Sequence, residues 1–173
     1  MKNQTLVGII MGSDSDLPVM TEAAKVFDEF NIGYEVRIIS AHRTPDVMVA
    51  YAKTAQERGL KVIIAGAGGS AHLPGMTASE TTLPVLAVPV KGEHHDHEAL
   101  WSNVKMPPGI PLATMPENGA KNAALMAVEI LGLLDKDLQQ KYIDYRQKQH
   151  TEVTEKDDKL VAKGWRNYLG DKH

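Results

Sequence analysis

The first 134 residues alternate short apolar runs with helical stretches, and this alternation limits the chain to a small group of folds. Residues 6–11 form a continuous apolar run bounded by polar residues, which is typical of a strand buried on both faces. Further strands are predicted at residues 34–39, 61–65, 84–90 and 111–114, and helices at residues 17–31, 45–58, 72–79 and 118–134. Repeated strand–turn–helix units with short turns predict a parallel sheet that carries helices on both faces and has right-handed crossovers.

The predicted fold class is therefore α/β: a three-layer, doubly wound (flavodoxin-like) parallel sheet with a C-terminal helical extension. We expect residues 1–134 to form an α/β catalytic domain and residues 135–173 to form a C-terminal helix and tail. The helix predicted at residues 135–149 has only a narrow apolar stripe, so it is either mostly solvated or packed on another subunit. Residues 151–173 are charged and are expected to be loosely attached, although one more docked turn could form through Leu160, Val161, Trp165 and Tyr168.

Composition excludes several classes of function. A chain of 173 residues, 43% hydrophobic and 24% charged, is typical of a single globular domain. The net charge of −3 gives no electrostatic basis for a nucleic acid or membrane partner. The chain has no cysteine, which excludes disulfides and thiolate metal sites, and the apolar run near the N-terminus is too short for a signal or a membrane span. We therefore expect a cytoplasmic protein.

The turn after the second predicted strand carries residues suited to catalysis. Ser40, His42 and Arg43 lie at what would be the carboxyl end of a strand, where open α/β sheets bind ligands. Thr44 and Pro45 then start a helix, as N-cap and as first helical residue. A hydroxyl, a proton carrier and a fixed cation suit an anionic substrate that needs a proton moved. The alternative is an ordinary turn with polar surface residues.

The turn after the first strand reads GSDSD and allows two interpretations. Its backbone N–H groups and hydroxyls at a helix N-terminus suit an anion, and a carboxylate there can accept hydrogen bonds from ribose hydroxyls. In the alternative, Asp14, Ser15 or Asp16 only caps the following helix.

The turn after the third strand resembles a dinucleotide site only in part. Residues 66–71 fit the fingerprint G-x-G-x-x-A, but the acidic ribose ligand expected about twenty residues later is missing. His72, Leu73 and Pro74 are also expected to interrupt the helix at residues 72–79. We therefore interpret the glycines as letting the backbone approach a small planar ligand closely.

Two further segments each allow a functional and an ordinary interpretation. His94, His95 and His97 lie among acidic residues, but helical zinc pairs usually stand four residues apart, so a solvated loop without metal is favoured. Residues 106–109, MPPG, form a rigid turn that is either a lid over the site or a plain connection.

Six motifs together resemble a known family: GSDSD, SAHRTP, AGAGGSAHLPGM, LPVLAVPV, MPPGIPLAT and NAALMAVEIL. In this order, from about residue 7 to about residue 144, they are similar to 5-(carboxyamino)imidazole ribonucleotide mutase, the PurE family of purine biosynthesis. They resemble the bacterial mutase class rather than the class that carboxylates aminoimidazole ribonucleotide directly with carbon dioxide. Two segments depart from the family's pattern: the histidine-containing loop after Val90 and the short stretch MPENGAKNAA.

The resemblance implies an isomerase that moves a carboxylate from the exocyclic amine of its ribonucleotide substrate to the neighbouring ring carbon, without metal or cofactor. It implies a homo-octamer with sites at subunit junctions, which would give the helix at residues 135–149 a partner. His42 would be the general acid and base, Ser40 and Arg43 would hold the phosphate, and Asp16 the ribose hydroxyls. The other substrate-binding residues it implies are Gly12, Ser13, Ala41, Ala67, Gly68, Gly69, His72 and Leu73.

Within this set, Ala67, Gly68 and Gly69 would enclose the migrating carboxylate with backbone N–H groups. His72 would border the site, unless it is instead a histidine buried between sheet and helix. Two other functions stay open beside the mutase. One is a non-catalytic flavodoxin-like module that binds a nucleotide or flavin, and the other is a metal-dependent hydrolase that uses the histidine loop.

Overall fold

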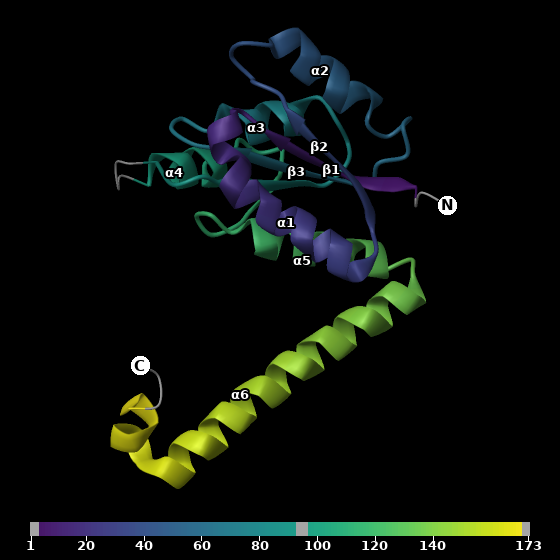
Figure 1. Ribbon diagram of the computed structural model, residues 1–173. Helices are drawn as coiled ribbons and strands as arrows, with labels where there is room; N and C mark the ends of the chain where they lie inside the picture. The colour runs from purple at the N-terminus through teal and green to yellow at the C-terminus, as the bar shows by residue number, and fades with distance from the viewer. Residues whose placement is uncertain (1–3, 93–96, 171–173) are drawn as a thin grey trace. The chain divides into compact units, whose positions relative to one another are not determined.

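A computed structural model describes residues 4–92 and 97–170, and the chain divides into two compact units, Met1–Leu131 and Gly132–His173. The first unit contains one sheet of five parallel strands in the order β2-β1-β3-β4-β5 (Figure 1). The strands are β1 (Thr5–Met11), β2 (Gly33–Ile38), β3 (Val62–Ala67), β4 (Val85–Pro89) and β5 (Ala113–Thr114). The sheet extends from β1 to β2 on one side and from β1 through β3 and β4 to β5 on the other, and this strand order confirms the doubly wound α/β fold.

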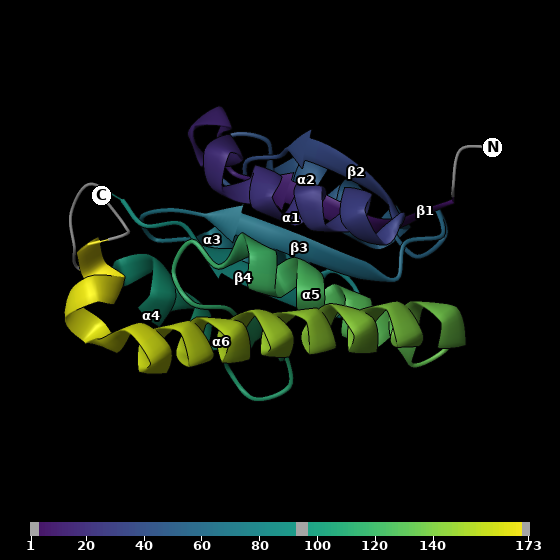
Figure 2. The same ribbon diagram turned by 60° about the horizontal axis from the view of Figure 1, so that its bottom comes forward.

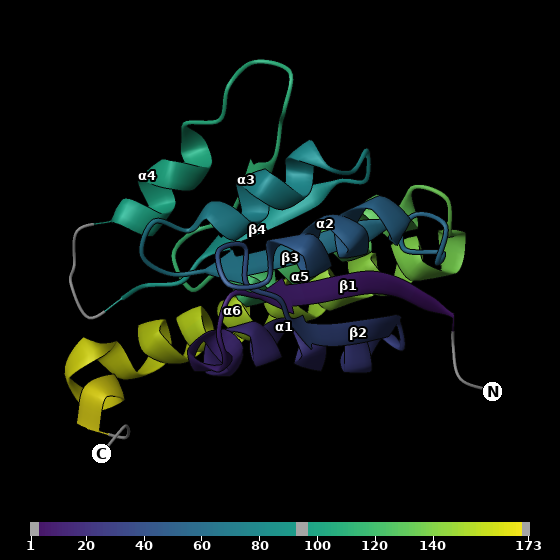
Figure 3. The same ribbon diagram turned by 90° about the horizontal axis from the view of Figure 1, so that it is seen from above.

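Helices cover both faces of the sheet. Helices α1 and α5 lie on one face, and α2 and α3 lie on the other (Figures 2 and 3). The helices are η1 (Asp14–Asp16), α1 (Leu17–Phe30), α2 (Pro45–Thr54), α3 (His72–Ser79), α4 (Glu98–Val104), α5 (Ala120–Gly132) and α6 (Lys136–Gly170). Every predicted strand is found. Among the predicted helices of the first unit, α3 has the predicted ends, and α1, α2 and α5 are shorter than predicted.

Burial agrees with the position of each strand in the sheet. β3 and β4 are buried along their whole length, and β1 is buried from Val7 to Met11. β2 is an edge strand, and its apolar residues Val36 and Ile38 are 40% and 55% exposed. The expectation of a strand buried on both faces therefore holds for β1.

Three expectations about the first unit are wrong. β3 continues through Gly66 and Ala67, which were expected in the turn, because both residues fit the fully buried centre of the sheet. α3 is continuous across Pro74, since a proline in the first turn of a helix needs no N–H partner. α4 was not predicted.

The second unit also differs from expectation. α6 runs from Lys136 to Gly170, so the segment expected to be a loose tail is helical. Gly164 has φ 70° and ψ 150°, which breaks the helix and turns the chain (Figure 1). Within the part of the chain that the structure describes, no helix has the length and apolar character needed to cross a membrane.

Candidate active site

The three turns at the carboxyl ends of β1, β2 and β3 meet around one cavity of about 480 Å³. The three turns singled out in the sequence therefore share one cavity. Eleven of the twelve site residues predicted from the sequence line this cavity. The cavity is lined by Gly12, Ser13, Ser15, Asp16, Ser40, Ala41, His42, Arg43, Ala67, Gly68, Ser70, Ala71, His72 and Leu73. The list includes every predicted residue except Gly69, and it adds Ser15, Ser70 and Ala71.

The central feature of the cavity is a pair of histidines from different turns. His42 Nε2 lies 2.7 Å from His72 Nδ1, and the two rings meet edge to face at 90° with centroids 4.9 Å apart. One ring nitrogen must donate the shared proton and the other must accept it. His72 is exposed, so the alternative of a histidine buried between sheet and helix is wrong.

Arg43 joins the first turn to the second. Its Nη2 donates to the Gly12 carbonyl at 3.0 Å, and its backbone N–H and its Nε donate to Ser40 Oγ at 3.1 and 3.4 Å. Thr44 occupies the N-cap position of α2, but its hydroxyl bonds both the N–H and the carbonyl of Ser40, at 3.1 and 3.0 Å. Thr44 is therefore the N-cap residue and Pro45 the first helical residue, as predicted, but the Thr44 side chain makes no capping hydrogen bond because its hydroxyl closes the turn instead.

The first turn is organised by a reciprocal pair of caps. Ser13 is the N-cap of η1: its Oγ accepts from the Ser15 N–H at 3.3 Å, and its own N–H donates to Asp16 Oδ2 at 3.1 Å. Asp16 is 6% exposed. Burial raises the pKa of its carboxyl above the ordinary value, although hydrogen bonds from the Ser13 and Gly12 N–H groups act in the opposite direction. Asp16 thus has a structural role and also lines the cavity.

The third turn brings the backbone close to the cavity. A Cβ atom at Gly68 would lie 3.2 Å from the Val90 carbonyl oxygen, a tight contact that glycine avoids. Gly69 has φ 58° and Ala71 has φ 44°, both in the left-handed region. Ser70 faces the neighbouring helix α4, where its hydroxyl donates to Glu98 Oε1 at 3.3 Å.

Neither His97, the described histidine of the considered metal cluster, nor the possible lid at residues 106–109 lines this cavity. His94 and His95 fall outside the described residues, and His97 Nδ1 lies 2.8 Å from Glu117 Oε2. Within residues 4–92 and 97–170, no three His, Cys, Asp or Glu side chains come close enough to hold a metal ion. Residues 106–109 line a different cavity, together with parts of α4 and the loop before β5.

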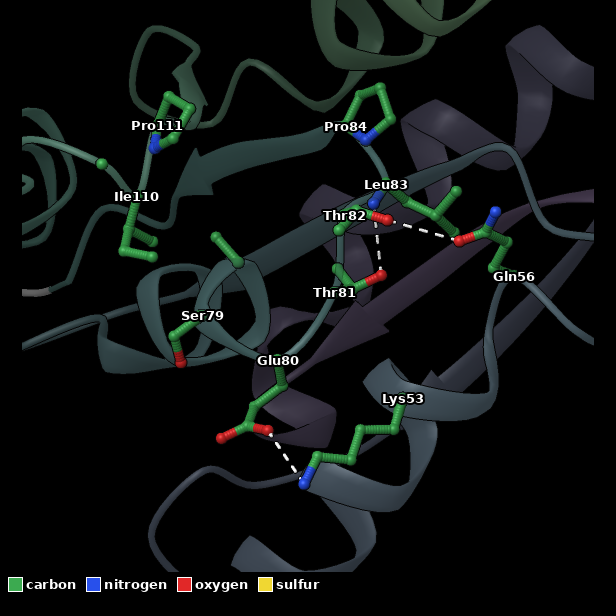
Figure 4. A pocket seen from close by; sticks show the side chains of 12 residues that line it. Lys53, Gln56, Ser79, Glu80, Thr81, Thr82, Leu83, Pro84, Ile110 and Pro111 are labelled. Carbon is green, nitrogen blue, oxygen red and sulfur yellow. Dashed lines mark hydrogen bonds and ion pairs between the residues drawn. The ribbon is translucent and has the colours of Figure 1, made fainter.

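A larger cavity of about 740 Å³ lies where the chain enters β4 and β5 (Figure 4). Its polar side chains bond to one another: Lys53 lies 3.4 Å from Glu80, and Thr82 donates to Gln56 at 3.3 Å. Its lining contains none of the site residues predicted from the sequence. The smaller cavity with the histidine pair is therefore the candidate active site.

Known proteins share both the sequence and the fold. Residues 6–152 match the family described as AIR carboxylase. N5-carboxyaminoimidazole ribonucleotide mutase of Thermotoga maritima is 54% identical over 167 residues, covering 96% of this chain and 98% of that protein. Phosphoribosylaminoimidazole carboxylase of Saccharomyces cerevisiae is also 54% identical, over 96% of this chain but 29% of that longer protein.

Among solved structures, a crystal structure of Treponema denticola PurE matches with a TM-score of 0.82 at 32% identity, covering 90% of this chain and 98% of that chain. The sequence match and the fold match thus extend over nearly the whole chain. The chain therefore belongs to the AIR carboxylase (PurE) family, in which the N5-carboxyaminoimidazole ribonucleotide mutases are found.

Proposed function

We propose that this protein is an N5-carboxyaminoimidazole ribonucleotide mutase of purine biosynthesis. It converts 5-(carboxyamino)imidazole ribonucleotide to 5-amino-1-(5-phosphoribosyl)imidazole-4-carboxylate. The observation that carries the proposal is the position of His42, whose Nε2 lies at the meeting point of the three turns and within 2.7 Å of His72. The 54% identity to a mutase over almost all of both chains supports the same assignment.

The proposed chemistry needs one proton carrier and a closed space. His42 donates a proton to the exocyclic nitrogen as the N–C bond breaks and carbon dioxide leaves. The ring carbon then attacks the carbon dioxide, and His42 takes up the proton that this carbon loses. The turn at residues 67–71 holds the carbon dioxide beside the ring, so that it is recaptured rather than lost to water.

The rest of the substrate binds through groups that do not react. Arg43 uses two of its five side-chain N–H donors on Ser40 and Gly12, which leaves donors for a phosphate. Asp16 accepts hydrogen bonds from the ribose hydroxyls. Burial removes water from the Asp16 carboxylate and disfavours its charged form. Hydrogen bonds from the ribose hydroxyls would take the place of that water.

The direct test supplies purified protein with 5-(carboxyamino)imidazole ribonucleotide and follows formation of the ring-carboxylated isomer without ATP or added metal. We expect conversion under these conditions. A parallel reaction with aminoimidazole ribonucleotide and bicarbonate separates the two activities of the family. Efficient use of this second pair, with the carboxyamino compound ignored, would assign the protein to the carboxylase class. A yellow preparation containing bound flavin would instead favour the non-catalytic module.

We also propose that the protein acts as a homo-octamer in the cytoplasm, with residues 135–173 packed on a neighbouring subunit. The exposed apolar residues of the β2 edge and of α6 support an assembly, since Ile38, Val153 and Val161 are 55%, 64% and 77% exposed in the single chain. Light scattering after size-exclusion chromatography tests this: eight chains of 18.9 kDa give about 150 kDa.

A further inference from the structure

The turn that carries His72 has an unusual backbone. Gly69 and Ala71 both adopt left-handed conformations, with φ 58° and φ 44°. A residue with a Cβ atom keeps this conformation only where its surroundings hold it. Since His72 follows Ala71 directly, the conformation of this turn determines where the His72 ring lies against His42.

Backbone hydrogen bonds hold the two ends of this turn. Val90 N–H donates to the Ala67 carbonyl at 2.9 Å, and Ala71 N–H donates to the Gly68 carbonyl at 3.1 Å. In the middle of the turn, a side chain bonds to a distant element: Ser70 Oγ donates to Glu98 Oε1 at 3.3 Å. Glu98 is the first residue of α4 and lies 28 positions away in the chain.

The start of α4 is itself firmly placed. His97, directly before Glu98, bonds Glu117 at 2.8 Å, and its carbonyl accepts from the Trp101 N–H at 3.0 Å. Ala99, directly after Glu98, is 5% exposed and belongs to the same buried cluster as Ala71. Glu98 therefore extends from a fixed support toward the middle of the turn.

We propose that Glu98 is a positioning residue for the reaction. By accepting the hydrogen bond of Ser70, its carboxylate holds the turn in which Gly69 and Ala71 are left-handed. This aligns His72 with His42 and keeps the enclosure around the carbon dioxide closed. The inference rests on the proposed mutase function, and it concerns the chemical step, because the phosphate and ribose are held by the other two turns.

The inference predicts a specific kinetic result for Glu98→Ala and Ser70→Ala. Each variant is expected to lower kcat about threefold to tenfold, the effect of one lost hydrogen bond, and to leave KM within about twofold. Each should also release more aminoimidazole ribonucleotide per turnover, since carbon dioxide escapes from a looser enclosure. Loss of structure alone does not produce this change in product ratio at constant KM.

Further variants separate positioning from general damage to α4. The double variant is expected to be no slower than Glu98→Ala, because that substitution already removes the bond of Ser70. Glu98→Gln retains the Oε1 acceptor and should keep near wild-type kcat and product ratio. Ser102→Ala is the matched control: its hydroxyl donates to the Ala99 carbonyl at 3.1 Å within α4, and its loss should change neither.

The outcomes are distinguishable. Wild-type protein that fails to convert the carboxyamino substrate overturns the proposed function itself. Active wild-type protein with unchanged kcat and product ratio in both single variants, or with additive losses in the double variant, overturns only the role of Glu98. If Glu98→Ala does not fold by circular dichroism, Ser70→Ala decides the question alone, since Ser70 is exposed and its truncation leaves no buried gap.

Discussion

His42 and His72 share one hydrogen bond, and this bond restricts the protonation states of the pair. The 2.7 Å separation of Nε2 and Nδ1 requires one nitrogen with a proton and one without. Two imidazolium rings would present a donor to a donor. The two rings therefore form a coupled pair in which only one of the two facing nitrogens is a donor at a time.

Replacing His42 should remove chemistry and leave binding largely intact. In His42→Asn we expect kcat to fall about 10²-fold to 10⁴-fold, the usual contribution of a positioned acid and base. Product affinity, measured by calorimetry, should stay close to the wild-type value, because the phosphate and ribose contacts belong to other side chains. His150→Asn, on the exposed surface of α6, is the control. A His42→Asn enzyme with more than about a tenth of wild-type kcat contradicts the assigned role.

Asp16 should lower the stability of the fold while it serves the site. Folding raises the pKa of its carboxyl. At pH values above this pKa, the ionised carboxylate therefore lowers the free energy of unfolding. In Asp16→Asn the amide oxygen can still accept from Ser13 N–H. We therefore expect a higher melting temperature at neutral pH and weaker substrate binding.

The pH dependence checks the cause of this stabilisation. The gain from Asp16→Asn should shrink as the pH falls toward 3.8, the ordinary value, where the wild-type carboxyl is protonated in the folded state. Asp14→Asn, at an exposed neighbouring position, is the control for a simple change of charge. A melting temperature of Asp16→Asn below wild type at neutral pH would count against the argument.

At the scale of elements, the sequence predicted what depends on local pattern and missed what depends on distant partners. The apolar runs identified the strands, and the rule that parallel sheets bind ligands at their carboxyl ends identified the three turns. Gly66 was misplaced because a glycine inside a buried strand looks the same in sequence as a glycine in a turn. α4 has only seven residues and no clear apolar period, and its start depends on the bond between His97 and Glu117.

The same distinction applies to the longest helix and to the histidine pair. α6 was predicted too short because most of its surface is exposed, so no apolar stripe marks its second half. The contact of His42 with His72 joins positions 30 residues apart, and no local pattern encodes their distance. The sequence indicated which polar residues each turn carries, but it did not indicate the hydrogen bonds that join one turn to another.

One ion pair connects the edge strand β2 to the turn after α2. Arg58 Nη1 donates to Glu35 Oε1 at 2.6 Å. Burial alone would raise the pKa of Glu35, but the hydrogen bond and charge of Arg58 hold it below the ordinary value. Stability from this pair is therefore present above the unfolded carboxyl pKa of about 4.5 and is lost as the pH falls through the folded pKa.

Glu35→Gln should therefore destabilise the protein only where the carboxylate is charged. Because both side chains are partly exposed, we expect a loss of roughly 0.5–1 kcal/mol in the free energy of unfolding at neutral pH. The difference should disappear in acid. Urea denaturation across the pH range measures it. Glu22→Gln, from an exposed pair with Lys25 on α1, should have almost no effect. A loss for Glu35→Gln that persists in acid would point to packing instead.

At the scale of the whole molecule, the residues that line the candidate cavity and the family match cover different parts of the chain. All residues that line the active cavity lie within Met1–Leu131, whereas the match to the family continues to residue 152. The first half of α6 is thus part of what the family shares, although it contributes nothing to the cavity in a single chain. An assembly in which this helix packs on a neighbour would account for both facts.

Removal of residues 136–173 should therefore affect assembly first. We expect the shortened protein to show a lower mass by light scattering and to lose at least about tenfold in activity, since the proposed sites lie at subunit junctions. Circular dichroism should still report a folded α/β unit. Removal of residues 171–173 alone is the control. Full activity in a monomeric shortened protein would contradict the proposed octamer.

Arg43 follows His42 in the chain, and its side chain bonds to both the first turn, at Gly12, and the second turn, at Ser40. We therefore expect a phosphate bound to this guanidinium also to restrict the position of the neighbouring His42 imidazole. In the proposed mechanism, the residue that binds the substrate phosphate and the residue that transfers the proton are therefore neighbours in the chain. The riboside that lacks the phosphate should consequently have a lower kcat than the ribonucleotide, because no phosphate contact to Arg43 then helps to position the His42 imidazole.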